Sequence, residues 1–471
     1  TDAIRIFCKE HKIKKIKFFE GYNSRLSMFF SKSNNKIKFE KKNFLLFSFK
    51  FLYKILLVKT SLINFLKEIY SLIYSKNNTI IHNTKHDHVI YSNFPNGWNF
   101  NKYASNRFFG GKINKKKNTH LFSIVKNNQY NLGFNLKLFN KLKKIKNYTI
   151  LESNGSLKNI FYSYFIMKKN KKNIFNKLNI FFKNNLIAEI LSDGITIIEI
   201  PTQNIFIQNL KNFFEASKIK KIIISIPEFV DGRIINKVSN ENNILTYGLQ
   251  HSSIGILQHS RFISMIKSLD KINKKYVSNK MFVENIKIKK YYGNVSFSIK
   301  VVGNIRINKR NNFQTAVGTN VYYIAEMHNI SLLKERVENI LKKSNNKFLF
   351  IRLHPGKKRT QEKIIMSIKD YNKNLFIDKS ENLMQGIKKI KPELTYTSSP
   401  TVYIELITNN LKVVLVNDNS FITNYPSDIK KNKIVLSDKF NIRDFQQKIH
   451  KVPTTIYGKD SENKIIEYFY E

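Results

Sequence analysis

Cysteine is nearly absent from this sequence of 471 residues, which contains only Cys8. A single thiol can form no disulfide within the chain and cannot supply a cysteine-based metal site. Residues 1–30 also lack the apolar segment of a secretory signal. We therefore expect a cytoplasmic protein without a cysteine-based metal site.

Acidic residues are also scarce: 33 Asp and Glu face 82 Lys and Arg, giving a formal net charge of +49. This excess fits a polyanionic partner, either nucleic acid or an anionic membrane surface. It also fits compositional drift, because Lys, Asn, Ile and Phe dominate and the basic residues are spread along the whole chain. We disfavour nucleic acid, because the sequence contains no recognisable RNA- or DNA-binding motif.

A long uncharged apolar run is missing as well. Residues 41–76 are very apolar, but they are interrupted by Lys50, Lys54, Lys59 and Lys67. No uncharged stretch approaches the roughly 20 residues that span a bilayer. The spacing predicts an amphipathic helix over residues 43–75 with these lysines near one face. Such a helix either packs on its own domain or lies on a membrane surface.

From residue 88 onward, short apolar runs alternate with segments of helical period. The expected strands are residues 88–93, 120–125, 148–153, 220–228, 244–251, 299–304, 320–326, 347–353, 374–378, 394–398 and 412–417. Strands that alternate with helices predict parallel sheets built from βαβ units. The gap near residues 255–280 predicts an α/β fold of two Rossmann-like domains facing a cleft, with an extra N-terminal helical segment. We expect the domains at residues 1–270 and 271–450, followed by a tail helix at 451–471.

The stretch "KFLFIRLHPGKK" ends a buried strand in polar residues. Ligands of parallel sheets bind beyond the carboxyl ends of the strands. Arg352 can form paired hydrogen bonds with phosphate oxygens, and His354 can donate to them. Pro355 and Gly356 predict a tight turn. An ordinary β-turn with a surface histidine is the alternative.

The stretch "TYTSSPTVYIEL" predicts a second anion site at a helix start. Ser399 is placed to cap a helix, whose free N–H groups suit a phosphate. Ser398 and Thr401 add hydroxyl groups, and Glu405 is placed to accept hydrogen bonds from a sugar. Simple capping is the alternative.

Two further strand ends carry polar residues. Gln250 and His251 close the first run of strands and are expected to project into the cleft. Beyond a later strand, Asn304 follows a glycine in a turn, and Arg306 is placed to reach phosphate.

The order of these motifs resembles the GT-B glycosyltransferases that build bacterial surface polysaccharides, such as capsule biosynthesis proteins. Teichoic-acid polyol-phosphate transferases and bacterial sialyl- and polysialyltransferases resemble the chain more distantly. The resemblance covers residues 220–420 and reaches "EGYNSRLS" and "GWNFNKYASNRFFGG" near the N-terminus. It implies that His354, Ser398 and Ser399 hold the donor nucleotide's phosphates.

The resemblance also implies catalytic roles in the first domain. Glu228, in "IPEFVDG", stands where relatives have a glutamate and is a candidate base for the acceptor hydroxyl, with Asp231 and Asp193 as competitors. His251 is a further catalytic candidate. Ser252 replaces the glycine that usually follows the Gln-His pair, so the close backbone approach that glycine permits is in question.

The function that follows is transfer of a sugar from a nucleotide-activated donor to a surface glycan or lipid-linked acceptor. No cofactor is expected, and no Asp-x-Asp sequence is present. A peripheral position on the inner face of the cytoplasmic membrane fits a lipid-linked acceptor. A sugar-nucleotide epimerase of the same fold and a CDP-alcohol polyol-phosphate transferase remain open, ahead of a nucleic-acid-binding protein.

Overall fold

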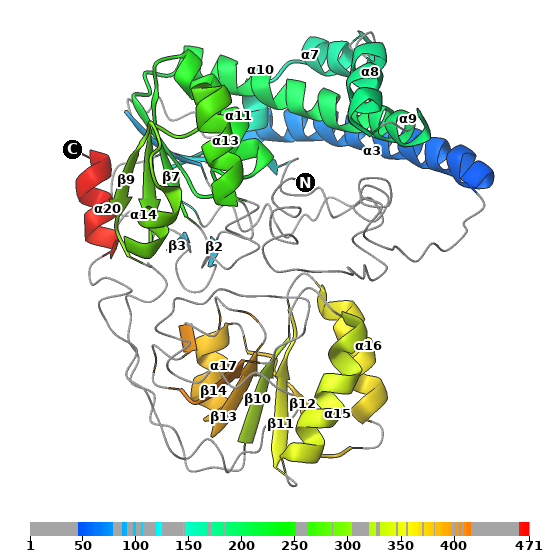
Figure 1. Cartoon of the computed structure of the whole chain (residues 1–471), viewed down its shortest axis with the longest axis vertical. Coiled ribbons are helices and arrows are strands. Elements are labelled where there is room, and N and C mark those ends of the chain that lie inside the picture. The colour runs from blue at the N-terminus through cyan, green and yellow to red at the C-terminus, as the bar shows by residue number, and fades with distance from the viewer. Residues whose placement is uncertain are drawn as a thin grey trace. The chain divides into compact units, whose positions relative to one another are not determined.

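The computed structural model of the protein describes most of the predicted strands and helices (Figure 1). The described residues are 46–78, 87–91, 98–99, 105–106, 119–124, 145, 147–166, 171–182, 185–250, 262–284, 286–303, 320–325, 330–344, 347–354, 357–369, 372–380, 382–397, 399, 402, 405–406, 409, 411–415 and 461–470.

The first sheet has seven strands in the order β5-β4-β1-β6-β7-β8-β9. Its strands are β1 (His88–Tyr91), β4 (Thr119–Phe122), β5 (Tyr148–Ile150), β6 (Lys221–Ile224), β7 (Leu245–Leu249), β8 (Lys280–Val283) and β9 (Ser298–Val301). The pairs β1–β4, β1–β6, β4–β5 and β8–β9 are parallel. The order reverses between β1 and β6, and this is the position where open α/β sheets bind ligands.

The helices that accompany this sheet begin with the long α3 (Leu46–Asn78). They continue with η1 (Leu151–Asn154), α7 (Leu157–Phe161), η2 (Tyr162–Ile166), α8 (Lys171–Phe182), α9 (Asn185–Gly194), η4 (Ile195–Glu199), α10 (Ile200–Ala216), α11 (Val230–Glu241), α13 (Ser264–Ile272), η6 (Lys274–Tyr276) and α14 (Ile286–Tyr292). A short antiparallel pair joins β2 (Trp98–Asn99) to β3 (Ser105–Asn106).

The main core of the first sheet lies between its central strands and two helices. Tyr91 and Ile224 on β1 and β6 pack with Phe206 and Leu210 of α10 and with Ile235 of α11. The strands carry continuous apolar runs, as strands covered on both faces do. A smaller cluster on β4 and β5 encloses Trp98.

The second sheet has five strands in the order β12-β11-β10-β13-β14, and all its neighbouring strands are parallel. They are β10 (Asn320–Ile324), β11 (Phe348–Arg352), β12 (Leu375–Ile377), β13 (Leu394–Thr397) and β14 (Val413–Leu415). The strand order reverses between β10 and β13. In Figure 1, α15 (Leu333–Lys343) and α16 (Lys358–Lys369) cover one face and α17 (Leu383–Ile390) covers the other. The short η8 (Ile330–Leu332) precedes α15.

These two parallel sheets confirm the predicted α/β class with two Rossmann-like sheets. One strand was assigned to the wrong run: residues 299–304 were expected in the second run, but β9 belongs to the first sheet. The intervening β8 begins at Lys280, at the end of the gap placed near residues 255–280, and was not predicted. Packing divides the chain into two compact units, and the second unit includes Gly248–Ile272 and Asn279–Glu471, so it holds β8 and β9 as well as the whole second sheet. The boundary proposed at residue 270 stays a prediction.

The helix expected at residues 43–75 is α3, which begins at Leu46 and ends at Asn78. The prediction that its lysines lie near one face was wrong, because Lys59 is exposed whereas Lys67 is buried. Lys54 forms an ion pair with Glu189 of α9 at 3.6 Å. Among the helices in the described part of the chain, none combines the length and apolarity needed to cross a bilayer.

The expected tail helix is present as α20 (Ser461–Tyr470). The Tyr468 ring lies 6.2 Å from the ring of Phe282 on β8, and the Lys300 ammonium lies 5.0 Å from the Tyr468 ring. Ile465 and Phe469 are fully buried. The helix is therefore packed beside β8 and β9 of the first sheet.

Candidate functional site

The carboxyl edge of the second sheet brings two of the predicted phosphate motifs to either side of β10. Arg352 on β11 and Thr397 on β13 are both register partners of Ile324, the last residue of β10. His354 and Ser399 each follow two residues later. Because neighbouring strands are about 4.8 Å apart, the two motifs leave the sheet about 10 Å from each other. They therefore flank the position at which the strand order reverses.

The turn after β11 is held by a residue that the sequence did not single out. The His354 N–H donates to Oε1 of Gln361 at 2.7 Å, and the Lys357 N–H donates to the His354 carbonyl at 3.0 Å. Gln361 lies in the first turns of α16 and is buried. The half-buried His354 is thus fixed between the end of β11 and the start of α16. Pro355 and Gly356 lie outside the described residues.

Ser399 occupies the capping position that the sequence predicted. Its hydroxyl accepts a hydrogen bond from the Val402 N–H at 3.4 Å, and its own N–H donates to Oγ1 of Thr397 at 3.1 Å. Val402 and Glu405 are helical. The Glu405 carbonyl accepts from the Asn409 amide at 2.7 Å. A helix start therefore follows β13 directly, while Ser398 and Thr401 lie outside the described residues.

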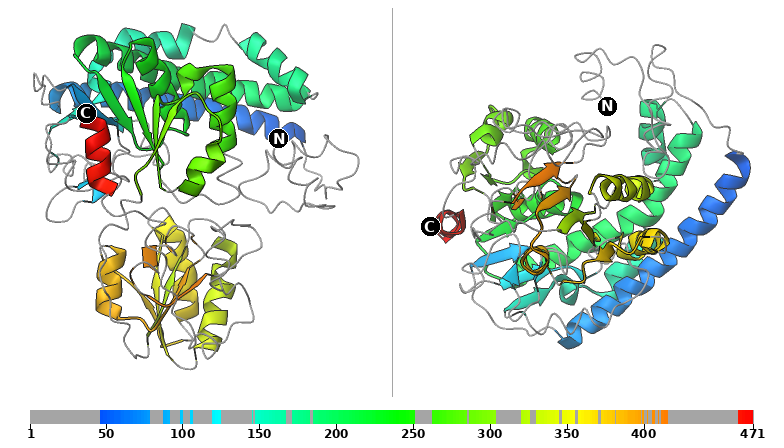
Figure 2. Two further views of the ribbon diagram at one scale, coloured as in Figure 1. Left: turned by 60° about the vertical axis from the view of Figure 1, so that its left-hand side comes forward. Right: turned by 90° about the horizontal axis from the view of Figure 1, so that it is seen from below.

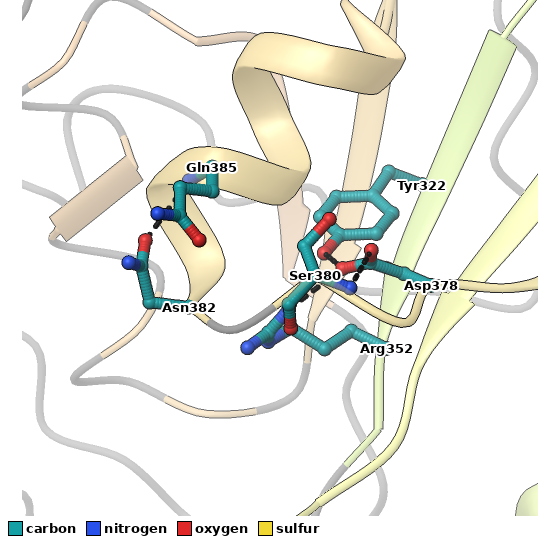
Figure 3. Close-up of polar contacts among 6 residues, drawn as sticks. All are labelled: Tyr322, Arg352, Asp378, Ser380, Asn382 and Gln385. Atoms are coloured by element: carbon teal, nitrogen blue, oxygen red, sulfur yellow. Dashed lines mark hydrogen bonds and ion pairs between the residues drawn. The ribbon is translucent and has the colours of Figure 1, made fainter. Parts of the chain in front are cut away.

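Arg352 takes part in a buried network that the sequence did not reveal (Figure 3). Its Nη1 lies 2.7 Å from Oδ2 of Asp378, just beyond β12, and donates to the Ser380 carbonyl at 3.2 Å. The Tyr322 hydroxyl donates to the same Asp378 oxygen at 2.6 Å, and the Ser380 N–H donates to Oδ1 at 2.8 Å. The charge of Arg352 is therefore shared with Asp378. A phosphate contact by Arg352 stays a prediction.

The protonation states in this network follow from its hydrogen bonds. Burial alone would raise the pKa of Asp378, but hydrogen bonds from Ser380, Tyr322 and Arg352 hold that pKa below its ordinary value. Burial, followed by the hydrogen bond to Asp378, raises the pKa of Tyr322. Asp378 is thus an anion and Tyr322 a neutral donor near neutral pH. The acid after the strand in "NLFIDKS" was the available signal, but pairing it with Arg352 requires knowing that β11 and β12 are neighbours.

Close packing behind the network leaves no room for a side chain at Gly386 of α17. A Cβ at Gly386 would lie 2.5 Å from Oδ2 of Asp378 and 2.7 Å from the Tyr322 hydroxyl. The helix itself is capped by Asn382, whose Oδ1 accepts from the Gln385 N–H at 2.9 Å (Figure 3). Gly386 therefore lets α17 approach the Asp378 carboxylate.

The carboxyl edge of the first sheet carries the predicted carboxylates. Glu228 is buried in the turn between β6 and α11, and Asp231 is half-buried in the first turn of α11. The Tyr91 hydroxyl, at the end of β1, is buried and has no hydrogen-bond partner among the described residues. Burial raises the pKa of Tyr91 well above its ordinary value, and the negative charges of Asp231 and Glu152 add to the rise. Acidic groups thus gather where the order of the first sheet reverses.

Glu152 is a buried acid that sequence reasoning missed. It follows β5, and its Oε1 accepts from the Ser123 hydroxyl at 2.6 Å while its Oε2 accepts from the Ile124 N–H at 3.1 Å. Its position after the strand in "YTILES" was the only signal. These bonds tie the segment after β4 to η1, so they support a structural role for Glu152.

Of the remaining predicted residues, the two that the structure describes form other contacts. The Gln250 amide pairs with Glu284 just beyond β8: the Glu284 N–H donates to Oε1 of Gln250 at 3.1 Å, and Nε2 lies 3.5 Å from the carboxylate. Asp193 lies on α9, buried in an ion pair with Lys171 at 2.5 Å, and is not at a strand end. His251, Asn304 and Arg306 lie outside the described residues. Gly303 has the positive φ of 88° expected for a glycine turn.

Within the described ranges, no three His, Cys, Asp or Glu side chains are grouped so that they could hold a metal ion. The chemistry available at the two edges is therefore that of a histidine, a helix start and hydroxyl groups on one sheet, and of carboxylates on the other.

Comparisons with known proteins give similarity of structure only. No protein-family model and no curated protein sequence matches the chain. UDP-GlcNAc 2-epimerase from Methanocaldococcus jannaschii, solved with UDP-GlcNAc and UDP, is 12% identical over 81% of this chain and 99% of its own, with a TM-score of 0.46. UDP-GlcNAc 2-epimerase from Neisseria meningitidis, bound to UDP-GlcNAc, is 13% identical over 66% of this chain and 96% of its own, with a TM-score of 0.44. MurG from Acinetobacter baumannii is 9% identical over 82% and 99% respectively, with a TM-score of 0.40. These TM-scores lie below 0.5, so the fold assignment rests on the sheets themselves.

Proposed function

We propose that the protein is a glycosyltransferase that uses a nucleotide-activated sugar, and that the donor's phosphates bind at the carboxyl edge of the second sheet. The observation that carries this proposal is the register of β10 with β11 and β13, which sets the His354 turn and the Ser399 helix start on either side of one strand. A helix start attracts anions through its free N–H groups, and a histidine adds a donor that can carry charge. A pyrophosphate is long enough to contact both.

The proposed reaction assigns a different task to each sheet. The acceptor's hydroxyl oxygen attacks the anomeric carbon of the sugar, and the bond from that carbon to the phosphate oxygen breaks. Glu228 takes the proton from the hydroxyl group. His354 and the helix start after Ser399 stabilise the negative charge that develops on the leaving phosphate. A surface glycan or a lipid-linked glycan is the proposed acceptor, and with the latter the enzyme works at the cytoplasmic face of a membrane.

A sugar-nucleotide epimerase is the second candidate. The observation that favours it is that two carboxylates, Glu228 and Asp231, lie together at the carboxyl edge of the first sheet. An epimerase needs acid and base groups around the sugar and no acceptor. Incubation with a nucleotide sugar alone separates the two functions: an altered sugar still attached to its nucleotide supports the epimerase. Polyol-phosphate transfer from a CDP-alcohol would use the same phosphate contacts and is distinguished by its donor.

The nucleotide site is tested by calorimetric titration of the full chain with CMP, CDP, UDP and GDP. We expect one of them to bind and His354→Ala to weaken its binding about 10- to 100-fold, because a hydrogen bond to a charged group contributes about 1.5–3 kcal/mol. Lys379→Ala is the matched control, because Lys379 is an exposed cation that follows β12 at the same edge. Its substitution should change the affinity less than threefold.

Glu228→Gln provides the complementary test, because a base acts on the acceptor and not on the donor. Turnover should fall while nucleotide affinity stays within a factor of about two of that of the unmodified protein. The proposal fails if none of the four nucleotides binds, if His354→Ala binds them normally, or if Glu228→Gln retains full turnover.

A further inference from the structure

Helix α3 presents apolar side chains to solvent along most of its length. We call the α3 stripe the six residues Ile55, Val58, Leu62, Leu66, Tyr70 and Ile73, which are between 38% and 63% exposed. Four of them, Ile55, Leu62, Leu66 and Ile73, recur at intervals of seven, four and seven, which places them on one face of a helix. With a rise of 1.5 Å per residue, the stripe is about 27 Å long.

The opposite face of α3 is the one that packs, and it is the more polar of the two. Its buried residues include Lys67, Glu68, Ser71 and Ser75 alongside Leu57 and Leu72. In the right-hand view of Figure 2, α3 runs along the outer side of the helices of its unit. The amphipathic pattern is thus inverted relative to an ordinary surface helix, and the core of the unit does not explain the stripe.

A cluster of aromatic rings extends the apolar surface beyond α3. Phe65, beside the stripe, contacts Phe161 of α7 and Phe165 of η2 edge-to-face, with ring centroids 5.2 and 5.6 Å away. Phe161 and Phe165 are stacked on each other, and both are about half exposed or more. Leu157 and Tyr162 are exposed on the same two helical segments. An exposed apolar surface of this kind is typical of an interaction site.

Charge identifies the occupant of this surface. Exposed Lys59 and Lys76 lie on α3 within the arc of the stripe, and exposed Lys158 adjoins Leu157 on α7. The whole chain carries a net charge of +49, so a second copy would be repelled whereas an anionic lipid surface would be attracted. No helix in the described residues spans a bilayer, and apolar residues flanked by lysines suit a helix that lies in the headgroup region.

We propose that the α3 stripe and the aromatic cluster of Phe65, Phe161 and Phe165 dock the protein onto an anionic membrane surface. The apolar side chains enter the boundary between headgroups and acyl chains, while Lys59 and Lys76 contact lipid phosphates. This inference does not depend on the proposed transferase activity, because it rests on the exposed apolar surface of α3, α7 and η2 and on the charge of the chain.

Vesicle co-sedimentation of the full chain tests the docking surface. We expect binding to vesicles of phosphatidylcholine mixed with phosphatidylglycerol and weaker binding to phosphatidylcholine alone. The double substitution Leu62→Glu and Leu66→Glu should reduce binding about tenfold or more, because two acidic groups replace the central apolar contacts. Ile272→Glu is the matched control, since Ile272 is 81% exposed at the end of α13 and lies outside the surface; it should bind normally.

The lysines are tested separately from the apolar contacts. Lys59→Glu should weaken binding to the anionic vesicles at least about fivefold and leave binding to phosphatidylcholine unchanged. Lys274→Glu, at an exposed lysine of η6, is the control for charge reversal elsewhere in the same unit and should have a smaller effect.

Depth of insertion provides a readout that does not depend on affinity. The only natural tryptophan, Trp98, is buried, so an introduced indole dominates any quenching by brominated lipid. Leu66→Trp should be quenched by vesicles of brominated phosphatidylcholine and phosphatidylglycerol, and Ile272→Trp should not. The proposal is overturned if the unmodified protein does not bind anionic vesicles or if both tryptophans respond alike. It is also overturned if sedimentation velocity shows a dimer that Leu62→Glu with Leu66→Glu converts to a monomer.

Discussion

Among single residues, His120 illustrates how a core fixes a protonation state. It lies on β4, with its ring 4.8 Å from the ring of Trp98 and stacked on Phe122, and its Nδ1 has no hydrogen-bond partner in the part of the chain that the structure describes. Burial lowers the pKa of His120 from 6.5 to about 3. The folded protein therefore keeps this imidazole neutral near neutral pH.

This protonation state predicts an acid-sensitive stability. Below pH 6.5 the unfolded chain binds a proton at His120, whereas the folded chain does not bind it until the pH falls to about 3. The free energy of unfolding should therefore fall by up to about 1.4 kcal/mol per pH unit as the pH drops below 6.5. His120→Phe should remove this slope, as measured by urea unfolding at about pH 7.5 and 5.5. Burial also lowers the pKa of His88, so the His120→Phe variant should still lose some stability as the pH falls, with a shallower slope than the unmodified protein. Identical slopes would contradict the prediction.

At the scale of elements, the start of α11 is pressed against the turn that carries Glu228. A Cβ at Gly232 would lie 2.3 Å from the Ile226 carbonyl oxygen and 2.7 Å from Cα of Pro227. Both are backbone atoms, so they cannot move aside as the end of a side chain can. The glycine in "PEFVDG" therefore sets how closely α11 follows β6.

Gly232→Ala should accordingly destabilise the protein by about 1–3 kcal/mol, because the turn has to shift to admit a methyl group. Gly194→Ala in α9 is the matched control. Its Cβ would meet only the Tyr53 hydroxyl at 3.0 Å, and alanine is favoured over glycine within a helix by about 1 kcal/mol. Urea unfolding of the two variants measures the difference. The account of this turn is wrong if Gly232→Ala is no more destabilising than Gly194→Ala.

Elements were also where sequence reasoning succeeded and failed most clearly. The strands at β1, β6, β10, β11 and β13 were predictable, because each is a short apolar run that stops at a polar residue. β8 was missed, because the apolar residues of "KMFV" lie in a basic stretch at the end of the gap that was placed between the two runs of strands. The strand order was also out of reach, since β9 continues the same alternation and only backbone pairing assigns it to the first sheet.

In the candidate site, too, local features were predictable from the sequence and contacts between distant strands were not. The capping role of Ser399 follows from local chain geometry, so it was predictable from five residues of sequence. The pairing of Arg352 with Asp378 joins residues on two strands and depends on which strands are neighbours. Gln361 was missed for a different reason: a glutamine on a basic helix gives no sign that its amide is buried beneath the His354 turn.

At the scale of the whole molecule, the charge of +49 acts on every folded part at once. Repulsion among like charges opposes a compact state, and it is screened over about 10 Å at 0.1 M salt. Some of the ion pairs in the described residues lie at the surface, as with Lys220 and Asp87 at 3.0 Å. Salt screens such surface pairs, but the stability lost in this way should be small.

The melting temperature should therefore rise when NaCl is increased from about 0.02 to 0.3 M, by about 2–4 °C for each kcal/mol of repulsion that is screened. Scanning calorimetry measures the rise. KCl at the same ionic strength should give an equal effect, because screening does not depend on the identity of the cation. A constant or falling melting temperature would show that self-repulsion is not significant in this fold.

The packing of α20 beside β8 and β9 has a consequence for how the gene can be rearranged. The chain leaves the first sheet after β9, forms the whole second sheet, and returns to contact Phe282 and Lys300 through Tyr468. In genetic terms the segment that forms the second sheet is an insertion between β9 and α20, which pack together. The codons for residues 304–460 could be exchanged for a short linker, and the shortened chain would still encode the seven strands of the first sheet and the helix that packs at their end.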